Sequence, residues 1–464
     1  MEIGNEEEEK LIFSFEIQNC MQNYYYQISV FDDKRNFKTS EILCANGGNT
    51  ISFEEGMEYG FIFEKKQKIT LVISKRALYD KPDNIAKIIF LANIVTSKSG
   101  SYKTDLSDSY NTEIIVIMAK KSKENIEKKY LFDYLKSGIK LSCFISFDFS
   151  QKNISKIKDD NLSILKNIFQ SIEDYTDDRR YYSSGFGAKT KESKNPAFDI
   201  AQSKLDSDKL IEKYKYNLES QNIIPEKKIE LSFLIKKITS DIYQIYEPTK
   251  YNVLFLLMSK DIDKKDKKNF INQIIASSYL PLSIFIIGIG NNNFTELKTI
   301  LKKITKYFNE GMEKVRDNAI FTTNFSHITS SKTISFCLRE LSRQMIQYYI
   351  YNKYCPENDE KQNKKELEKS INIYQKIQNE NNANNEDNSD SQSNSTPIQD
   401  NPITTPGNSY NQVINSNSED ISKSTKSENN ATYSLKASDF FPQENPFSKN
   451  SSSKTDYNSL KKSH

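Results

Sequence analysis

Two apolar runs separated by one amphipathic segment, all within residues 251–290, constrain the fold of this chain most strongly. The runs are VLFLLM at 253–258 and LSIFIIGI at 282–289. Continuous apolar runs of this length are typical of parallel strands that helices cover on both faces. The segment between them places its apolar side chains on one helical face, namely Phe270, Ile271, Ile274 and Ile275. The pattern predicts a β-α-β unit.

Further strands and helices alternate through residues 130–355. An apolar strand is predicted at 139–147, ending at Asp148, and a helix follows at about 162–175. Amphipathic helices are predicted at 231–242 and 334–349. This alternation predicts an α/β domain with a mostly parallel, doubly wound sheet, in which ligands bind at the carboxyl ends of the strands.

Residues 1–119 have a different pattern, which predicts an all-β sandwich. Short segments rich in β-branched and aromatic residues are bounded by turn residues, as expected for antiparallel strands. The predicted strands are 11–17, 25–30, 59–63, 69–73 and 112–118. The charged segment 120–129 is interpreted as a linker, and the alternative is a helper site for anionic lipid.

The composition changes again at Pro356, where a tail at 356–464 begins. A charged piece is predicted to be helical to about Asn379, and the remainder is rich in Asn and Ser. Such a sequence cannot bury enough apolar surface to offset the entropy of ordering, so disorder is predicted there. Within it, Asn445, Pro446 and Phe447 form a tripeptide similar to the ligand of endocytic EH domains, in which a turn presents the aromatic ring.

Composition excludes several classes of function. Lys and Arg (65) nearly balance Asp and Glu (62), so the net charge of +3 argues against a dedicated nucleic-acid binder. Only two histidines are present, which argues against a histidine base or a histidine-rich metal site. Five scattered cysteines fit a reduced cytosolic setting. The acidic N-terminus predicts no secretory signal, and without a long apolar run any membrane contact is expected to be peripheral.

Four short stretches resemble the core of the von Willebrand factor A domain of copines. They are YNVL at 251–254, ASSYLPLSI at 276–284, IGIGN at 287–291 and SGFGAK at 184–189. In addition, residues 61–69 and 95–100 resemble the closing half of a C2 domain, which copines carry ahead of the A domain. The chain thus resembles a divergent copine with one C2-like module where the family usually has two, over about residues 53–355.

The resemblance implies a metal-ion-dependent adhesion site (MIDAS) in the A domain, built from an Asp-x-Ser-x-Ser motif with a later threonine and aspartate. Here Asp148 and Ser150 match the motif, but Lys152 stands in its third position. Ser259 takes the place of the distal aspartate, with Asp261 two residues later, and the threonine falls near Leu231 or Ser232.

Two interpretations of this degenerate MIDAS stay open. A lysine within about 4 Å of a divalent cation repels it by several kcal/mol, so Lys152 pairs with Asp148 and leaves a metal-free adhesion surface. Alternatively, Lys152 points away, and Asp148, Ser150 and Asp261 bind magnesium weakly.

Calcium binding by the sandwich would need several carboxylates that converge from loops. Asp32 and Asp33 follow one predicted strand, and Asp80 and Asp83 follow another, without a dense Asp-x-Asp pattern. The resemblance implies calcium-dependent phospholipid binding, whereas these residues favour a lipid or protein contact that is independent of calcium.

The glycines of the A domain offer no phosphate loop. Gly185, Gly187, Gly288 and Gly290 satisfy neither Gly-x-Gly-x-x-Gly nor a Walker pattern, and tight turns explain them. No catalytic residues and no organic cofactor are predicted.

The predicted function is that of a non-enzymatic, peripheral membrane or scaffold protein. The sandwich is expected to contact an acidic phospholipid surface, and the A domain, near Lys152, and the tail are expected to bind proteins. The predicted localisation is cytoplasmic and peripheral at the plasma or endosomal membrane. The alternative is a cytosolic adaptor in trafficking or signalling with no lipid affinity of its own.

Overall fold

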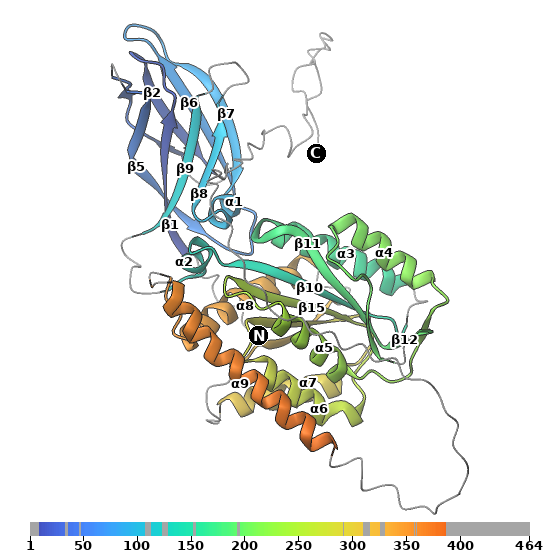
Figure 1. Ribbon diagram of the computed structural model, residues 1–464. Coiled ribbons are helices and arrows are strands. Elements are labelled where there is room, and N and C mark those ends of the chain that lie inside the picture. Colours follow the sequence, from blue (N-terminus) through green and yellow to red (C-terminus); the bar gives the residue numbers. More distant parts are fainter. Residues whose placement is uncertain are drawn as a thin grey trace, which may run out of the picture.

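Two folded parts, one β-rich and one α/β, follow each other along the chain in the computed structural model (Figure 1). The β-rich part lies within residues 9–122 and the α/β part within residues 129–386. The structure describes residues 9–32, 36–45, 48–106, 113–122, 129–151, 155–192, 195–290, 292–309, 316–324, 330–356, 358 and 360–386.

The β-rich part is a sandwich of two antiparallel sheets, which confirms the all-β prediction. One sheet has the order β5 (Thr50–Phe61), β1 (Glu9–Gln18), β9 (Ile114–Lys121) and β8 (Ser101–Asp105). The other has the order β3 (Asn36–Lys38), β2 (Tyr25–Phe31), β6 (Lys68–Arg76) and β7 (Asp83–Leu91), and β4 (Ile42–Leu43) pairs with β2. Alternate side chains of both sheets are buried between them, which is the period of two expected for strands with one solvated face.

The sequence prediction missed several parts of the sandwich. The strand predicted at 59–63 is the end of the longer β5. The rest of β5 was not predicted because acidic residues in its middle interrupt the alternation of apolar side chains. A Cβ at Gly56 would lie 2.4 Å from Cγ2 of Ile12, so glycine is needed where β5 crosses β1 at a bulge. Strands β3, β4, β7 and β8 were not predicted, and the first half of the segment 95–100 lies in a short helix, α1 (Ala92–Ser97), with a turn after it.

The α/β part contains a six-stranded sheet. Its order is β13 (Ala197–Asp199), β11 (Thr176–Phe186), β10 (Lys140–Asp148), β15 (Lys250–Met258), β16 (Leu282–Ile289) and β17 (Ala319–Asn324). The five strands from β11 to β17 are parallel, and only β13 pairs antiparallel. Strands β15 and β16 enclose α6 (Lys267–Ser277), which confirms the predicted β-α-β unit.

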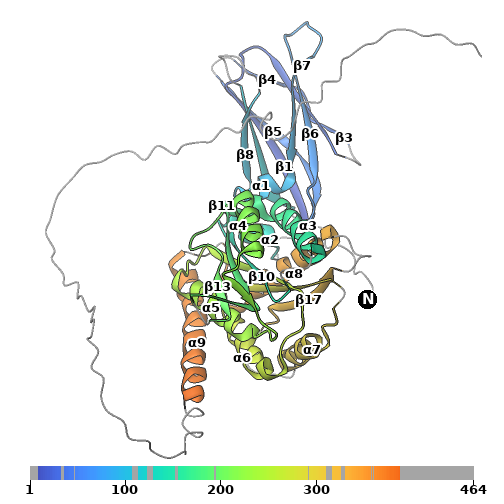
Figure 2. The same cartoon turned by 90° about the vertical axis from the view of Figure 1, so that its right-hand side faces the viewer.

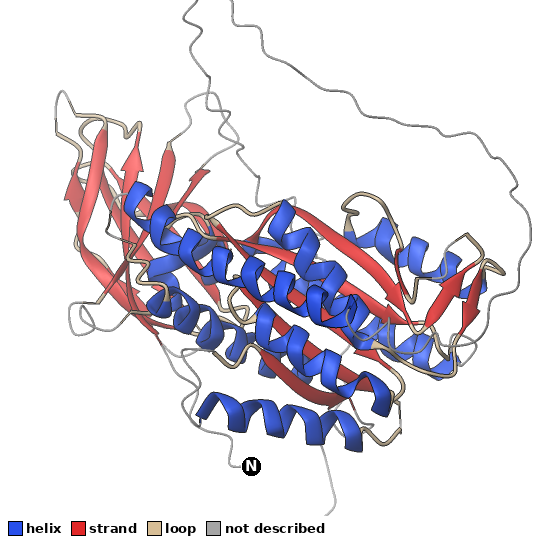
Figure 3. Ribbon diagram, turned by 60° about the horizontal axis from the view of Figure 1, so that its bottom comes forward, coloured by secondary structure: helices blue, strands red, loops and turns tan. Residues whose placement is uncertain are grey.

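Helices cover both faces of this sheet, as the continuous apolar strands require (Figure 3). Side chains that alternate along β10 and β15 belong to two separate cores. The first core includes α3 (Ser155–Ile172), α4 (Ser207–Glu219) and α8 (Ser330–Tyr351), and the second includes α5 (Leu231–Gln244), α6, α7 (Thr295–Asn309) and α9 (Glu360–Glu386).

Helix α9 differs from the predicted tail. The sequence placed the whole segment 356–464 outside the folded domains, whereas residues 360–386 form this helix, which packs on α6. Leu367, Ile371 and Tyr374 are buried on it, and the hydroxyl of Ser370 donates to the carbonyl of Tyr279 at 2.7 Å. The few apolar side chains of α9 are sufficient for packing because the helix lies against an apolar surface that the other helices of the second core already form. In the part of the chain that the structure describes, no helix is long and apolar enough to cross a membrane.

The two parts meet where the base of the sandwich rests on a short helix, α2 (Leu131–Lys136), and on the turn Glu173–Tyr175 (Figure 2). The buried carboxylate of Glu9 accepts hydrogen bonds from the backbone N–H groups of Leu131 (3.0 Å) and Phe132 (3.2 Å). The Asn93 amide donates to Asp174 at 2.5 Å, and the ring centroids of Phe63 and Tyr175 lie 4.7 Å apart. One continuous apolar core therefore joins the two parts.

Candidate functional site

The candidate site lies at the carboxyl edge of the parallel sheet, where the order of strands reverses. Strand β10 lies between β11, which follows it in the chain, and β15, which comes later. Loops leave such a switch point in opposite directions and open a crevice there. Asp148 is the last residue of β10 and Ser259 is the first residue after β15, so the topology brings both to this point.

Hydrogen bonds from the protein itself occupy the carboxylate of Asp148. The backbone N–H of Ser150 donates to Oδ1 at 2.7 Å. The backbone N–H and the hydroxyl of Ser259 both donate to Oδ2, at 2.9 and 2.6 Å. Asp148 is almost fully buried, and this burial raises the pKa of its carboxyl group against the opposing hydrogen bonds from Ser259 and Ser150.

The hydroxyl of Ser150 has no comparable partner. Its Oγ is buried and makes no hydrogen bond within the described residues. The hydroxyl nevertheless lies close enough to the carboxylate of Asp148 to lower the pKa of that group.

The other residues expected at the site lie elsewhere. Asp261 accepts hydrogen bonds from the backbone N–H groups of Glu296 (2.9 Å) and Leu297 (3.1 Å), so its carboxylate caps the first turn of α7. Ser232 donates through its backbone N–H and its hydroxyl to Asp266. These two aspartates therefore stabilise helix termini, and the weak magnesium site expected from Asp148, Ser150 and Asp261 is not assembled.

The donor set around Asp148 does not fit a divalent cation. Magnesium requires six oxygens in octahedral geometry, usually with carboxylates among them. Ser259 saturates Oδ2, no second carboxylate reaches the site within the described ranges, and only Oδ1 and the Ser150 hydroxyl retain acceptor capacity. Those ranges also contain no group of three His, Cys, Asp or Glu side chains that could hold a metal.

A glycine holds the backbone of the next strand against this carboxylate. Gly187 has φ +70°, and a Cβ there would lie 2.6 Å from Asp148 Oδ1 and 3.2 Å from the backbone N of Ser150. The predicted structural role of this glycine agrees with this geometry, because both the positive φ and the close contact exclude a side chain.

We expect Gly187→Ala to lower the free energy of unfolding by about 2 kcal/mol or more, because it adds a steric contact to an unfavourable φ. Urea titration measures the change. Gly138→Ala is the matched control, since Gly138 has φ +94° but nothing within 4 Å of the added Cβ. Equal losses of unfolding free energy in the two variants would show that contact of the added Cβ with Asp148 does not contribute to the loss in Gly187→Ala.

The aspartates considered as candidate calcium ligands do not converge. Asp32 follows β2 at the end of the sandwich that faces the α/β part, and it lines a pocket with Asn167 of α3 and Ser331 of α8. Asp80 and Asp83 lie at the other end, because Arg76 pairs with Tyr25 at the beginning of β2. A site built jointly from these three carboxylates is therefore ruled out by the antiparallel register.

Several predicted site residues cannot be placed. Asp33 and Lys152 lie outside the described residues, as do Asn445, Pro446 and Phe447. The pairing of Lys152 with Asp148 stays a prediction.

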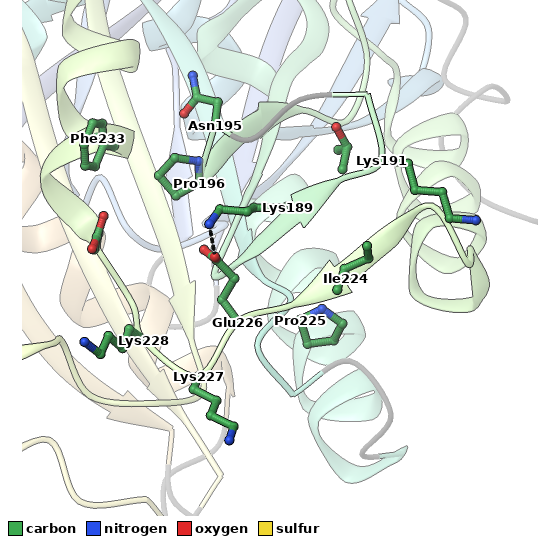
Figure 4. Close-up of a pocket in the computed structure, with 12 residues that line it drawn as sticks. Lys189, Lys191, Asn195, Pro196, Ile224, Pro225, Glu226, Lys227, Lys228 and Phe233 are labelled. Carbon is green, nitrogen blue, oxygen red and sulfur yellow. Dashed lines mark ion pairs between the residues drawn. The ribbon is translucent and has the colours of Figure 1, made fainter. Parts of the chain in front are cut away.

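The sequence analysis missed a groove next to Gly187. It has a volume of about 1100 Å³ and lies between the small two-stranded sheet of β12 (Ala188–Thr190) and β14 (Ile223–Pro225) and the beginning of α5 (Figure 4). Four lysines line it, and an ion pair of 2.5 Å joins Lys189 to Glu226 inside it. The only signal in the sequence was the charged run that precedes α5, at 226–230.

Comparison with known proteins identifies the family of the α/β part. The family model "Copine" matches residues 153–357. Among the curated relatives, Copine-A of Dictyostelium discoideum is 30% identical over 108 residues, which are 23% of this chain and 18% of that protein. The chain therefore spans less than a fifth of the length of this relative.

Solved structures are similar only at low scores. Proximal thread matrix protein 1 from the mussel byssus has a TM-score of 0.29 and 14% identity, and the match covers 44% of this chain and 48% of that one. A C2 domain of plant Extended Synaptotagmin 1 has a TM-score of 0.19 and 10% identity, over 25% of this chain and 95% of that domain. These scores carry no argument about fold or function.

Proposed function

Because this chain belongs to the copine family, we propose that it is a non-enzymatic, membrane-associated scaffold whose C2-like sandwich contacts phospholipid without calcium. Its von Willebrand factor A domain recruits protein partners at the carboxyl edge of the sheet. The proposed location is the cytoplasmic side of the plasma or endosomal membrane. Lys152 and the tripeptide Asn445, Pro446 and Phe447 remain proposed contacts for protein partners.

The distal end of the sandwich is the observation that carries the membrane contact. The loop between β6 and β7 lies at the end of the sandwich away from the α/β part (Figures 1 and 2). It exposes Leu78 (52%) and Tyr79 (93%). The turn before β2 and the strand β4 add two further exposed apolar side chains at this end, Met21 and Leu43. A leucine beside a tyrosine suits a membrane interface, because one is apolar and the other is amphipathic.

The charges of this end favour apolar insertion over attraction to acidic lipid. Arg76 is bound to Glu41, and Lys75 is bound to Glu113 at 3.0 Å. Lys81 is offset by Asp80 on the same loop and by Asp83 at the beginning of β7. These two carboxylates fall short of the six to eight oxygens of a calcium site. Binding should therefore persist with chelator and depend only weakly on salt.

We expect the double variant Leu78→Ser/Tyr79→Ser to lose at least about tenfold in vesicle affinity, because burial of each side chain contributes roughly 1.5–3 kcal/mol. The measurement is cosedimentation of the full chain with phosphatidylserine and phosphatidylcholine vesicles, with calcium and with chelator, across a salt series. The control is Tyr216→Ser/Ile245→Ser, which removes two exposed apolar side chains from the α/β part.

The outcomes of the cosedimentation experiment distinguish the membrane-associated scaffold from the cytosolic adaptor. Binding that requires calcium contradicts the calcium-free contact, and equal losses in both double variants contradict the distal end as its location. Absence of binding to every vesicle favours the second candidate, a cytosolic adaptor without lipid affinity. The groove beside Gly187 supports that candidate, because it offers a protein-binding surface that needs no membrane.

A further inference from the structure

The groove beside Gly187 exposes apolar side chains on both of its sides. Ile224 of β14 is 52% exposed and Phe233 of α5 is 48% exposed. Figure 4 shows Phe233 and Pro196 on one side and Ile224 and Pro225 on the other, with the pair of Lys189 and Glu226 between them. An apolar surface inside a polar rim is typical of a site that binds another chain segment.

The lining of this groove carries a small excess of positive charge, with four lysines against two glutamates. Lys191 and Lys227 form no side-chain ion pair within the described residues, and Lys228 lies 3.8 Å from Asp263. Of the two glutamates that line the groove, Glu226 is already bound to Lys189. The surface therefore suits an extended segment that carries bulky apolar side chains and carboxylates but no basic residue.

One segment of this chain has that composition. Residues 438–447 read SDFFPQENPF and contain two carboxylates and no Lys or Arg. All three phenylalanines of the segment 387–464 lie there, namely Phe440, Phe441 and Phe447. Two prolines restrict the backbone, which lowers the entropy lost when such a segment binds.

The chain between α9 and this segment is long enough for the two to meet. Residues 387–437 separate them. A random-coil chain of that length has a root-mean-square span of about 40 Å. This span is about twice the radius of gyration of a domain the size of the α/β part, which is about 18 Å, so the number of intervening residues is sufficient for the segment to reach the groove. A tethered ligand at this range has an effective concentration up to the millimolar range, so even weak contacts give substantial occupancy.

We propose that residues 438–447 bind in the groove of their own chain, with phenylalanine rings on Ile224 and Phe233 and with Asp439 and Glu444 facing the lysine rim. This inference goes beyond the proposed function and does not depend on lipid binding.

The test uses tryptophan fluorescence of the full chain. The chain contains no Trp, so Phe441→Trp introduces a single indole reporter. We expect an emission maximum shifted to the blue relative to the free peptide 438–447 with the same substitution. Adding Ile224→Asp should remove the shift, because it places a carboxylate at the apolar side of the groove. Ile245→Asp is the matched control on an exposed isoleucine outside the groove, and it should leave the shift unchanged.

Dilution shows whether the segment in the groove comes from the same chain or from a second copy. A shift that is independent of protein concentration supports binding within one chain, whereas a shift lost on dilution assigns the segment to a second copy and overturns the proposal. Emission of a solvated indole in the chain with an intact groove also overturns it, as does a blue shift that survives Ile224→Asp. Circular dichroism verifies that both aspartate variants remain folded.

Discussion

Ser259→Asp should destabilise the protein by about 3–5 kcal/mol at neutral pH, because it places a second carboxylate against the buried carboxylate of Asp148. Two buried carboxylates at hydrogen-bond distance cannot both ionise, so one of them has a strongly raised pKa in the folded state. The folded variant then holds a proton that the unfolded chain releases, and stability should recover as the pH falls from about 7.5 to about 5. Urea titration at several pH values measures this recovery.

The matched control at this position is Ser259→Ala. It removes the hydroxyl donor but keeps the backbone N–H bond to Asp148, so we expect a loss of about 1–2 kcal/mol without the recovery at low pH. Saturating Mg²⁺ should leave the unfolding of the wild-type chain unchanged, because the donors around Asp148 do not fit the ion. A clear stabilisation of the wild type by Mg²⁺ would contradict that conclusion and restore the weak metal site.

Glu9→Gln should flatten the dependence of stability on pH. Burial raises the pKa of the Glu9 carboxyl from 4.5 to about 8, against the hydrogen bonds from Phe132 and Leu131, and the charges that face it are Asp133 and Lys121. Between these two pKa values the folded chain keeps a proton that the unfolded chain has lost. The contribution of Glu9 to the free energy of unfolding therefore falls as pH rises, by up to about 1.4 kcal/mol per unit.

The variant should consequently be more stable than the wild type at about pH 8, by roughly 2–4 kcal/mol, and closer to it near pH 5. Thermal or urea unfolding across this range measures the difference. Glu58→Gln, at an exposed pair with Lys10, should leave the slope unchanged. If the stability of Glu9→Gln changed with pH as steeply as that of the wild type, the carboxyl group of Glu9 would not titrate in this range.

This junction also explains why the sandwich and the α/β part share one core. Glu9 caps a helix that is too short to be stable alone, and Lys121 bridges to Asp133 of the same helix at 3.0 Å. The first two residues of the segment 120–129, which the sequence analysis treated as a linker, thus belong to β9, and the second of them, Lys121, is fixed at the junction.

Local periodicity was sufficient to predict three of the six strands of the sheet and the helices α3, α5, α6 and α8, but β11, β13, β17, α4 and α7 were not predicted. The apolar runs of β10, β15 and β16 specify strands buried on both faces, and the single apolar face of 267–277 specifies the helix between the last two. Side-chain burial repeats along the chain with the period of each element, so the sequence alone determined these elements.

The tertiary structure decided how the candidate site is bonded. Asp148 and Ser259 are 111 positions apart, and only the strand order makes Ser259 the donor that saturates the carboxylate. Only the folded chain likewise shows that Asp261 caps the first turn of α7. The register of β2 and β6 places Asp32 at the opposite end of the sandwich from Asp80. A hydrogen bond requires atoms within about 3 Å, and a motif gives residue types without these distances. The choice between ligand, cap and solvated side chain is therefore made only when the chain has folded.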